Sequence, residues 1–417
     1  MADLLSVHDA QERINTAFEP LSSVFVNLRE ASQRVLAEDI SADTDLPPFD
    51  NSGMDGFAVR SQDVSQASAA QPVLLSVVED IAAGAAPQLA LQPGQSARIM
   101  TGAPIPGGCD AVIPIEDTDH SSTGTPVNFP FQVKIFGPVK PGAFIRPHGQ
   151  DIQRGQVVLQ SSRRIGPADV GLLASLGISQ VPVYRKPRIA ILSTGDELID
   201  VDQPLAPGKI RESNSYAIAA LVEKYGGEIL SFGTAPDRPE IIRQRLQIAV
   251  DQGADLILTT AGVSVGAFDY VKPVILEKGS LTFWKVDMRP GKPLAFGSYQ
   301  GIPLLGLPGN PVSAYVGFLV FVVPAINKMA GILQGSQAGI KATLTHALES
   351  DGRESYLRAV VKNEAGHLTA SLTGHQGSGN MYSLVQANAL LIVPSGVKSL
   401  PVGAEVFVWL LTNELTR

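Results

Sequence analysis

The hydrophobic pattern divides the chain into a central segment of alternating strands and helices and flanking segments of short strands. From residue 188 onward, short runs rich in isoleucine, leucine and valine alternate with stretches whose apolar residues recur every three or four positions. The first pattern is typical of buried strands and the second of amphipathic helices. Strands are predicted at residues 188–193, 227–233, 254–260, 281–286, 293–298 and 302–308, and helices at 213–225, 237–251, 268–278 and 310–329. This order predicts a βαβ three-layer domain with a mostly parallel sheet.

The flanking segments carry short alternating runs and frequent turns. Residues 43–151 are rich in proline and glycine and are expected to form a β-rich domain. Residues 166–178 predict a short helix, and the N-terminal residues predict an amphipathic one. After residue 331, short strands separated by turns predict an all-β domain, either a barrel or a sandwich, and we assign it as a C-terminal β-barrel.

Loops of small and polar residues follow three predicted strands, at residues 193–198, 259–266 and 307–311. Parallel sheets bind ligands beyond the carboxyl ends of their strands. We therefore expect the three loops to converge on one edge of the sheet and to form a compact ligand site.

Length, charge and cysteine content limit the classes of function. The 417 residues suffice for two to four domains, and 44% hydrophobic residues exclude a mainly disordered chain. A net charge of −8 argues against nonspecific nucleic-acid binding, which needs a basic surface. Because Cys109 is the only cysteine, an intrachain disulfide and a cysteine-rich metal site are excluded, and the six histidines show no metal-ligand spacing.

Two features predict a soluble cytoplasmic protein without a membrane partner. The N-terminal segment has acidic residues where a signal peptide has basic ones. The longest apolar run, residues 314–326, is thirteen residues long and contains Pro324, so we expect it to be too short to span a bilayer.

Charged residues in the predicted edge loops suit a metal–phosphate site. The chain has neither a P-loop nor the Gly-x-Gly-x-x-Gly fingerprint, so ATP hydrolysis by a P-loop and dinucleotide binding are both unsupported. Glu197 ends an acid pair after a buried strand, and Asp269 follows a Gly/Ser loop; each binds Mg²⁺ or simply starts a helix. A cluster of cations between two strands predicts either an anion site or a solvated hairpin: Lys285, Arg289 and Lys292.

Residues 262–266 read Gly-Val-Ser-Val-Gly and fit the nucleophile elbow of a serine hydrolase, with Ser264 as the nucleophile. Asp287 and a later histidine, His367 or His375, supply the other triad members in the required chain order. An elbow runs directly into a helix, however, and here further loop residues and a proline intervene. We therefore interpret this stretch as a small-residue loop that holds a phosphate-bearing ligand, to which Ser264 offers a donor.

Nine segments together resemble the molybdopterin molybdenumtransferase family, the bacterial MoeA and gephyrin E-domain family. In order they read DNSGMDGFAVR, RIMTGAPIP, GCDAVIPIED, RPHGQDI, LSTGDEL, AGVSVGAFDYVK, MRPGKPLAFG, GLPGNPVSA and TGHQGSGNM. They run from residue 50 to residue 381, so the resemblance covers nearly the whole chain. It implies a transferase of molybdenum cofactor biosynthesis, which inserts molybdenum supplied as molybdate into adenylylated molybdopterin with Mg²⁺-dependent release of AMP.

The resemblance, together with the loop positions, assigns the site residues. The implied catalytic carboxylates are Asp55, Asp151, Glu197, Asp237 and Asp269, of which Glu197, Asp237 and Asp269 are assigned to Mg²⁺. The implied substrate-binding residues are Thr101, Thr194, Gly195, Ser264, Lys285, Arg289, Lys292, Pro308, Pro311, Arg358 and Ser378. Because the dithiolene sulfurs of molybdopterin hold the molybdenum, the protein needs no cysteine cluster of its own.

The resemblance also implies four domains per subunit and an elongated homodimer whose site is completed across the interface. The ranges that follow are 1–23 with 185–331 for the molybdopterin-binding α/β domain, 24–42 with 152–184 for a linking and dimerisation domain, 43–151 for the β-rich domain, and 332–417 for the barrel. The implied partner proteins are the molybdopterin adenylyltransferase and the apoproteins of molybdoenzymes.

Two positions depart from the family pattern. Residues 260–262 read Thr-Ala-Gly where the family commonly has Ser-Gly-Gly, so Ala261 adds a methyl group where the backbone approaches the ligand. Arg289 replaces the lysine of some relatives and changes a point charge into a planar fork. A tungstate-preferring member of the family is the alternative function; a non-catalytic scaffold is disfavoured because the chain has no long linker or extra domain.

Overall fold

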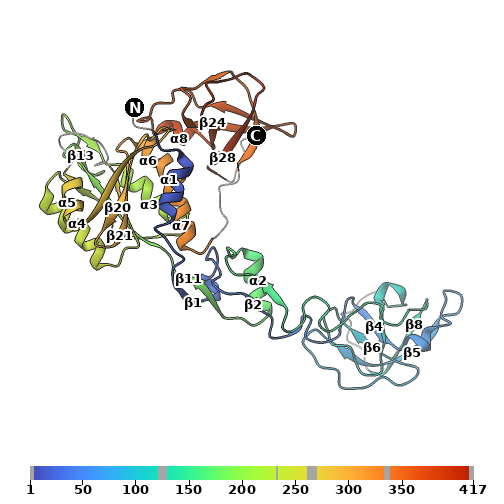
Figure 1. Cartoon of the computed structure of the whole chain (residues 1–417). Coiled ribbons are helices and arrows are strands. Elements are labelled where there is room, and N and C mark those ends of the chain that lie inside the picture. Colours follow the sequence, from blue (N-terminus) through green and yellow to red (C-terminus); the bar gives the residue numbers. More distant parts are fainter. Residues whose placement is uncertain (1–3, 121–128, 232, 261–269, 333–338, 413–417) are drawn as a thin grey trace. The chain divides into compact units, whose positions relative to one another are not determined.

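The structure, a computed structural model, describes residues 4–120, 129–231, 233–260, 270–332 and 339–412. The chain forms two compact units (Figure 1). The first unit comprises residues 1–38, 162–167 and 180–417, and the second comprises residues 39–161 and 168–179.

The first unit is built on a seven-stranded sheet in the order β15–β12–β17–β21–β20–β18, with β16 also paired to β12. The strands are β12 (Arg188–Thr194), β15 (Glu228–Ser231), β16 (Thr234–Ala235), β17 (Leu256–Thr260), β18 (Gly279–Lys285), β20 (Pro293–Tyr299) and β21 (Ile302–Leu307). Five of these strands pair in parallel, as predicted: β15, β16, β12, β17 and β21. The last two, β20 and β18, are antiparallel and extend one edge of the sheet.

The antiparallel edge follows from a two-residue turn. Gln300 and Gly301 join β20 to β21, and their φ angles of 48° and 83° are those of a tight hairpin. Such a short connection can join only antiparallel strands, because parallel neighbours need a crossover of a dozen residues or so. The predicted parallel sheet is therefore a mixed sheet on this side.

Helices cover both faces of the sheet and give the predicted three layers (Figure 1). One face packs against α1 (Val7–Asn15), α3 (Asn214–Lys224), α6 (Pro311–Gly317) and α7 (Val323–Met329) in the larger apolar core. The other face packs against α4 (Pro239–Asp251) and α5 (Val271–Lys278) in a second core. Both cores are mainly aliphatic, with a few aromatic residues such as Phe318, Phe321 and Tyr299 among them.

The predicted helix at residues 310–329 is interrupted by a π-helical turn, Phe318–Val322, between α6 and α7. Pro324 lies just after this turn and has no N–H to donate to the carbonyl four residues earlier, which belongs to Val320. The side-chain amide of Gln11 on α1 donates to that Val320 carbonyl at 2.8 Å. A side chain 309 positions away thus satisfies the carbonyl that the proline leaves without its helical partner.

This helical run is also longer than the thirteen-residue apolar stretch in the sequence indicated. Pro311–Met329 is 19 residues long and, by length and composition, could cross a membrane, so our expectation that it is too short was wrong. Within the protein, 78% of its most apolar stretch is buried, and its residues fill the larger core of the first unit. It is therefore a core helix of this unit.

The C-terminal part of the first unit is a closed five-stranded barrel. Its order is β24–β25–β22–β28–β26, and the additional pairing of β24 with β26 closes it. The strands are β22 (Ile340–Leu344), β24 (Glu354–Glu364), β25 (His367–Leu372), β26 (Ala389–Val393) and β28 (Glu405–Leu410), with a separate core inside them. The barrel rather than the sandwich is thus the correct alternative, and β19 (Met288–Arg289) joins it to the sheet domain by pairing with β24.

The second unit contains a five-stranded sheet in the order β7–β4–β6–β5–β8, as the turn-rich sequence predicted. These strands are β4 (Gly56–Val59), β5 (Val73–Ile81), β6 (Gln95–Ile99), β7 (Ala111–Pro114) and β8 (Phe131–Ile135). Shorter elements of the chain are β1 (Ser23–Asn27), β2 (Ile40–Ser41), β3 (Asn51–Ser52), β9 (Ile145–Arg146), β10 (Val157–Leu159), α2 (Pro167–Ser175), β11 (Gln180–Tyr184), β13 (Leu198–Ile199), β14 (Ile210–Arg211), β23 (Leu348–Glu349), α8 (Tyr382–Gln386) and β27 (Ser399–Leu400).

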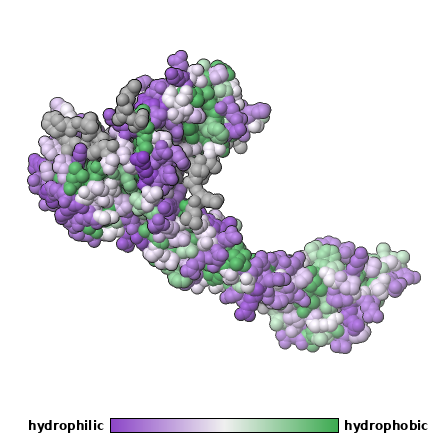
Figure 2. All heavy atoms as spheres, in the orientation of Figure 1, coloured by the Kyte–Doolittle hydropathy of each residue, from purple (hydrophilic) through white to green (hydrophobic). Residues whose placement is uncertain are grey.

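The surface is largely polar. Figure 2 shows hydrophilic residues over most of the visible face, with apolar residues scattered among them. Single exposed apolar side chains are ordinary on soluble proteins. Phe25 on β1 is among the most exposed of them, at 70%, together with Val385 at 75% and Tyr382 at 67%, and Val24 beside Phe25 is also exposed.

We expect Gln11→Leu to lower the Tm by about 2–4 °C, because it leaves the Val320 carbonyl buried without a partner, at a cost of about 1–2 kcal/mol. In a Pro324→Ala background the new N–H can donate to that carbonyl, so the same substitution should lower the Tm less. Scanning calorimetry of the four proteins measures both effects, with Glu12→Ala on the exposed side of α1 as the control. Equal losses in the two backgrounds would refute the assigned pairing.

Candidate functional site

The strand register brings the predicted site loops to one edge of the sheet. Ser193 of β12 pairs with Thr260 of β17, and Thr260 pairs with Leu307 of β21, so the three strands end at the same level. The antiparallel β20 starts at this level, since Ala295 pairs with Gly306. The cation-rich connection before β20 therefore reaches the same edge. The strand ends that precede the three predicted loops thus converge, while residues 261–266 of the second loop lie outside the described residues.

A buried polar network ties the strand ends together. The hydroxyls of Ser193 and Thr260 lie 2.6 Å apart, and Ser193 also donates to the Glu212 carboxylate at 3.1 Å. Glu212 is only 2% exposed, and its carboxylate accepts from the Ser215 backbone N–H at 2.8 Å and from the Ser215 hydroxyl. Glu212 thereby fixes the start of α3 to the end of β12.

The Glu212 carboxylate also caps α3. The N-cap residue Ser213 makes no side-chain capping bond. The preceding Glu212 carboxylate accepts the Ser215 N–H instead. The sequence pattern did not indicate Glu212, since its partner Ser193 lies on β12, nineteen positions earlier.

An acidic group lies beyond the ends of β12 and β16. Gly195 has a φ of 154°, which favours glycine, and a Cβ there would lie 2.5 Å from the Glu197 carboxylate, which would have to move aside. The backbone N–H of Asp237 donates to the Asp196 carboxylate at 3.1 Å. Burial raises the pKa of Asp237, and the nearby charges of Asp196 and Glu197 raise it further. Three carboxylates thus share one negatively charged region, next to the buried Thr194.

The acidic group suits the charge of a divalent cation. Carboxylate oxygens are the ligands that Mg²⁺ prefers, and a raised pKa shows that Asp237 lacks a neutralising partner. In the part of the chain that the structure describes, no group of three or more His, Cys, Asp or Glu residues forms a ready metal site. Of the three residues predicted to bind Mg²⁺, Glu197 and Asp237 lie in this acidic group, and Asp269 lies outside the described residues.

A cationic group lies on the barrel side of the same edge. Arg358 on β24 is fully buried; its Nε donates to the Ser383 hydroxyl and its Nη2 to the Gly377 carbonyl, both at 3.0 Å. Among the described residues, no carboxylate pairs with it. Burial, and secondarily the charge of Arg289, lower the pKa of Arg358 to about 10. An uncompensated buried cation next to a second arginine favours an anion.

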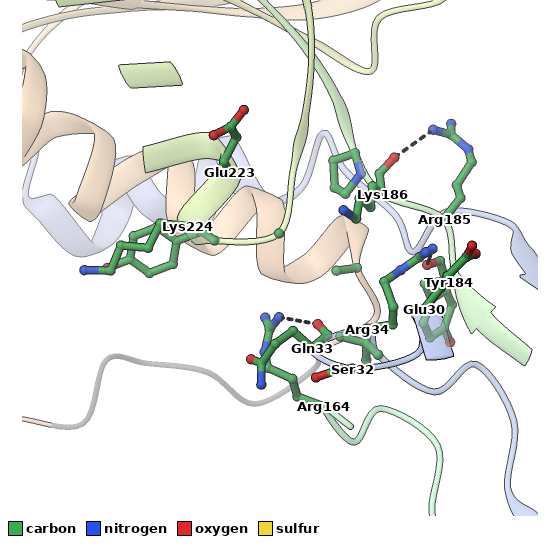
Figure 3. A pocket seen from close by; sticks show the side chains of 15 residues that line it. Glu30, Ser32, Gln33, Arg34, Arg164, Tyr184, Arg185, Lys186, Glu223 and Lys224 are labelled. Atoms are coloured by element: carbon green, nitrogen blue, oxygen red, sulfur yellow. Dashed lines mark hydrogen bonds between the residues drawn. The ribbon is translucent and has the colours of Figure 1, made fainter. Parts of the chain in front are cut away.

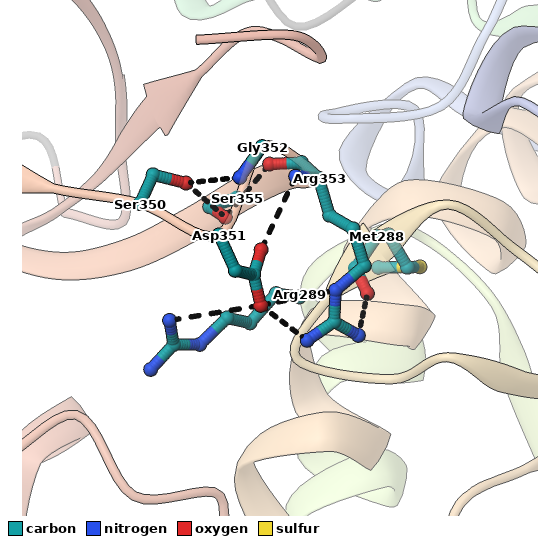
Figure 4. Close-up of polar contacts among 7 residues, drawn as sticks. All are labelled: Met288, Arg289, Ser350, Asp351, Gly352, Arg353 and Ser355. Carbon is teal, nitrogen blue, oxygen red and sulfur yellow. Dashed lines mark hydrogen bonds and ion pairs between the residues drawn. The ribbon is translucent and has the colours of Figure 1, made fainter. Parts of the chain in front are cut away.

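Arg289 lies on β19, which pairs with β24, the strand that carries Arg358. Figure 4 shows Arg289 beside Asp351 and Arg353. Its guanidinium lies 3.9 Å from the Asp351 carboxylate. Arg353 is the main partner of that carboxylate, since its Nε donates to Asp351 at 3.1 Å and its hydrogen bond is the leading cause of the lowered pKa of Asp351. Arg289 is therefore only a weak partner of Asp351, and its N–H donors stay available to another anion.

The other predicted residues of this side surround the two arginines. The Val312 N–H, one residue after Pro311, donates to the Ser378 carbonyl at 3.0 Å, which joins the barrel loop to the start of α6. Pro308 is buried at the end of β21, and Lys285 and Lys292 are exposed at the ends of β18 and β20.

Asn214, which sequence reasoning did not single out, faces the same edge. Its amide nitrogen donates to the Gly309 carbonyl at 2.7 Å. Its side-chain oxygen is buried and has no hydrogen-bond partner in the described structure. Such an oxygen accepts a hydrogen bond readily from a ligand, because leaving it unsatisfied is costly.

The predicted residues of the second unit form their own polar contacts. The Asp55 carboxylate accepts from both the backbone N–H and the hydroxyl of Thr101, each at 2.7 Å. These bonds, the backbone one first, lower the pKa of Asp55. Gly56 is required beside it, because a Cβ would lie 1.9 Å from the Ile113 carbonyl oxygen. Asp151 is exposed and forms an ion pair with Arg146 at 2.9 Å.

Ser264, Ala261 and Asp269 lie outside the described residues. Of the hydrolase alternative, Asp287 is described, and its carboxylate accepts from the Ser395 hydroxyl at 3.0 Å. His367 lies at the start of β25, where it pairs with Glu364.

Family models match almost the whole chain. The MoeA N-terminal region (domain I and II) matches residues 5–177, the probable molybdopterin binding domain matches residues 190–328, and the MoeA C-terminal region (domain IV) matches residues 341–411. The chain belongs to the MoeA family. The resemblance inferred from the nine sequence segments is therefore confirmed.

Individual relatives are similar over most or all of their length. A molybdopterin molybdenumtransferase from Nostoc sp. is 40% identical and covers 92% of this chain and 87% of its own. The molybdopterin molybdenumtransferase 2 of Mycobacterium tuberculosis is 39% identical, covering 98% and 100%. The crystal structure of a molybdopterin biosynthesis MoeA protein from Pyrococcus horikoshii superposes with a TM-score of 0.81 at 33% identity, covering 98% and 100%.

Membership confirms the predicted class of activity, a transferase of molybdenum cofactor biosynthesis. The comparisons favour neither the serine hydrolase nor the tungstate alternative.

We expect Thr101→Val to raise the pKa of Asp55 toward its ordinary value while leaving it lowered, because the backbone N–H still donates. A carboxylate with a lowered pKa stabilises the folded state above its unfolded pKa, and this stability is lost as the pH falls through the folded pKa. Because the folded pKa is higher in the variant, its free energy of unfolding should fall at a higher pH than that of the wild type. Carboxyl-resolved NMR titration measures this directly, with Thr118→Val as the control. An unchanged pKa of Asp55 in Thr101→Val would show that the Thr101 hydroxyl does not lower it.

Proposed function

We propose that this chain inserts molybdenum, supplied as molybdate, into adenylylated molybdopterin and releases AMP. Two observations support the proposal: the family to which the chain belongs, and the opposite charges at the two ends of one sheet edge. Two parts of the substrate match these two groups of charge. The phosphoanhydride needs a cation, which the acidic group can hold, and the pterin dithiolene must receive a tetrahedral dianion, which the cationic group can bind. The single observation that carries the anion half is the buried Arg358, with which no carboxylate of the described residues pairs.

The cationic group is proposed to receive molybdate. Arg289 and Ser378 are partly exposed and can contact an oxyanion. Arg358 is fully buried and attracts the oxyanion by its charge, without direct contact. In a low-dielectric interior, such a charge attracts an anion more strongly than it would in water. Arg358 also positions the loop before Ser378 through its bond to the Gly377 carbonyl. Lys285 and Lys292 add charge at the entrance, while Pro308 and Pro311 shape the wall.

The acidic group is proposed to hold Mg²⁺ through Glu197 and Asp237, with Asp269 as the third ligand. When bound, Mg²⁺ neutralises charge on the phosphoanhydride and makes AMP a better leaving group. The buried Thr194 and the tight Gly195 turn keep Glu197 in place beside Asp237. Asn214 offers its buried side-chain oxygen to an N–H of the substrate. Ser264, Asp55, Thr101 and Asp151 are proposed to contact the remaining parts of the substrate.

We further propose a cytoplasmic homodimer that receives its substrate from the molybdopterin adenylyltransferase and delivers its product to molybdoenzyme apoproteins. The exposed Phe25 and Val24 on β1 support an interface at that strand, because an apolar side chain exposed to this extent gains from burial in a partner. The wider domain division into four parts, with the ranges given above, belongs to the same proposal.

We expect Arg358→Gln to raise the molybdate concentration needed for half-maximal insertion by about tenfold or more, since the anion loses a charge in a desolvated setting. The Tm should not fall, because the substitution removes an uncompensated buried charge. In vitro insertion assays at varied molybdate, with Lys362→Gln further along β24 as the control, measure the effect. An unchanged molybdate dependence would contradict the assignment of the cationic group.

We expect Asp237→Asn to raise the Tm in the absence of Mg²⁺ and to abolish the increase in Tm that Mg²⁺ produces. The raised pKa of Asp237 means that the folded state disfavours the ionised carboxylate. The protonated carboxyl contributes stability below the unfolded pKa, and this contribution is lost as the pH rises through the folded pKa. At neutral pH the charge therefore opposes folding. Thermal shift with and without Mg²⁺ tests this against Glu240→Gln on α4; a Mg²⁺ response that survives in Asp237→Asn would exclude Asp237 as a ligand.

A further inference from the structure

A cavity of about 450 Å³ opens at the edge of the sheet opposite the candidate site. Pro187 and Gly226 in its lining precede the first residues of β12 and β15, whereas the candidate site lies beyond the last residue of β12. β12 is seven residues long, so the two sites are separated by roughly 20 Å of strand. The volume lies within the range of pockets that hold small organic ligands, about 300–1,000 Å³.

The lining of this cavity is rich in cations, although the chain as a whole has a net charge of −8. It contains five cationic and two acidic side chains: Arg34, Arg164, Arg185, Lys186 and Lys224, with Glu30 and Glu223. They come from three stretches of the chain that are far apart in sequence, at residues 30–35, 164 and 184–187, together with the C-terminal end of α3 (Figure 3). A positively charged cavity on an acidic protein indicates an anionic ligand.

Several of these charges already have partners in the protein. Arg185 forms a bidentate pair with Asp255, at 2.6 Å for both bonds, and is neutralised by it. The Lys224 ammonium donates to the Leu411 carbonyl at 2.6 Å. Arg34 donates to the Tyr184 carbonyl at 2.9 Å and has Glu30 within electrostatic range.

Arg164 and Lys186 are not neutralised in this way. Only Nη1 of Arg164 has a hydrogen-bond partner in the described structure, the Gln33 carbonyl at 2.9 Å. Burial lowers the pKa of Arg164, and among the residues that the structure describes no carboxylate opposes the effect. The exposed Lys186 has no ion pair with any described residue, and Figure 3 shows it across the cavity from Arg164. These two side chains leave an arginine fork and an ammonium group directed at the same space.

Capping of α3 does not account for Arg164. Cations stabilise the C-terminal ends of helices, and Arg164 lies near this end, since a Cβ on Gly226 would be 3.5 Å from its Nη1. Backbone N–H groups already occupy the carbonyls of the last turn up to Glu223, however: Tyr225 donates to Leu221, Gly226 to Glu223 and Gly227 to Val222. The one hydrogen bond of Arg164 in the described structure goes to Gln33 and not to α3, so its remaining guanidinium donors stay available to a ligand.

We propose that this cavity binds a small organic phosphate monoester, whose phosphate group pairs with Arg164 and Lys186. Arginine suits phosphate because its planar fork matches two phosphate oxygens, and lysine adds a point charge on the other side. The rings of Tyr184 and Tyr225 and the buried Pro187 provide the apolar wall for the organic part. The site is separate from the proposed molybdenum insertion site and does not depend on that proposal.

Calorimetric titration of the full chain with phenyl phosphate tests the inference, with inorganic phosphate and phenol as partial ligands. We expect one site whose Kd rises about tenfold or more in Arg164→Gln. It should be unchanged in Arg163→Gln, the adjacent arginine outside the lining, and in Arg358→Gln, which removes the charge at the candidate site. Phenol should not bind measurably, and inorganic phosphate should bind more weakly than phenyl phosphate.

Each other outcome overturns the inference in a recognisable way. Equal weakening in Arg163→Gln would reduce the effect to net charge, and weakening only in Arg358→Gln would place the phosphate in the candidate site. Lys186→Gln, at an exposed position, supplies a second test if Arg164→Gln fails to fold, and no weakening there would also contradict the proposal. Because insertion assays do not enter this experiment, its failure leaves the proposed function standing, and failure of Arg358→Gln to affect insertion leaves this site standing.

Discussion

The 2.6 Å hydrogen bond between Ser193 and Thr260 holds together the ends of the two central strands, and the candidate site rests on that alignment. Glu212 extends the bond into a buried network that also fixes the start of α3. Because the network is sealed from water, each member depends on the others for its hydrogen bonds, and loss of one leaves a polar group unsatisfied. The loops beyond the strands can then carry irregular, charged sequence, since the rigid strand ends below them set their starting points.

Charge is distributed along this edge in a way that opposes stability and favours binding. Asp237 is held near two other carboxylates with a raised pKa, and Arg358 is buried next to Arg289 with a lowered pKa. Each arrangement is unfavourable in the protein alone and becomes favourable when an ion of opposite charge arrives. Active sites commonly keep such uncompensated charges, and the stability they cost is supplied by the packed cores on both faces of the sheet.

Sequence reasoning recovered the parts of the fold that depend on local pattern. The apolar runs located β12, β17 and β21, and the small-residue loops after them marked the correct edge of the sheet. Arg358 was recognised as functional only through the family motif, because its burial and its lack of a carboxylate depend on the closure of the barrel. The pairing of Gln11 with the Val320 carbonyl, the capping of α3 by Glu212 and the cavity around Arg164 all join residues far apart in the chain. A pattern of hydrophobic and polar positions contains no information on such long-range contacts, and a single sequence offers no other source of that information.

The most direct test of the central claim is X-ray diffraction from crystals soaked in molybdate, measured at the molybdenum absorption edge. The account predicts an anomalous peak on the barrel side of the sheet edge, within hydrogen-bond reach of Arg289 and Ser378 and next to the buried Arg358. The peak should disappear in crystals of Arg358→Gln. A peak in wild-type crystals that lies elsewhere, or one that persists unchanged in the variant, would contradict the assignment of this edge as the place where the oxyanion is received.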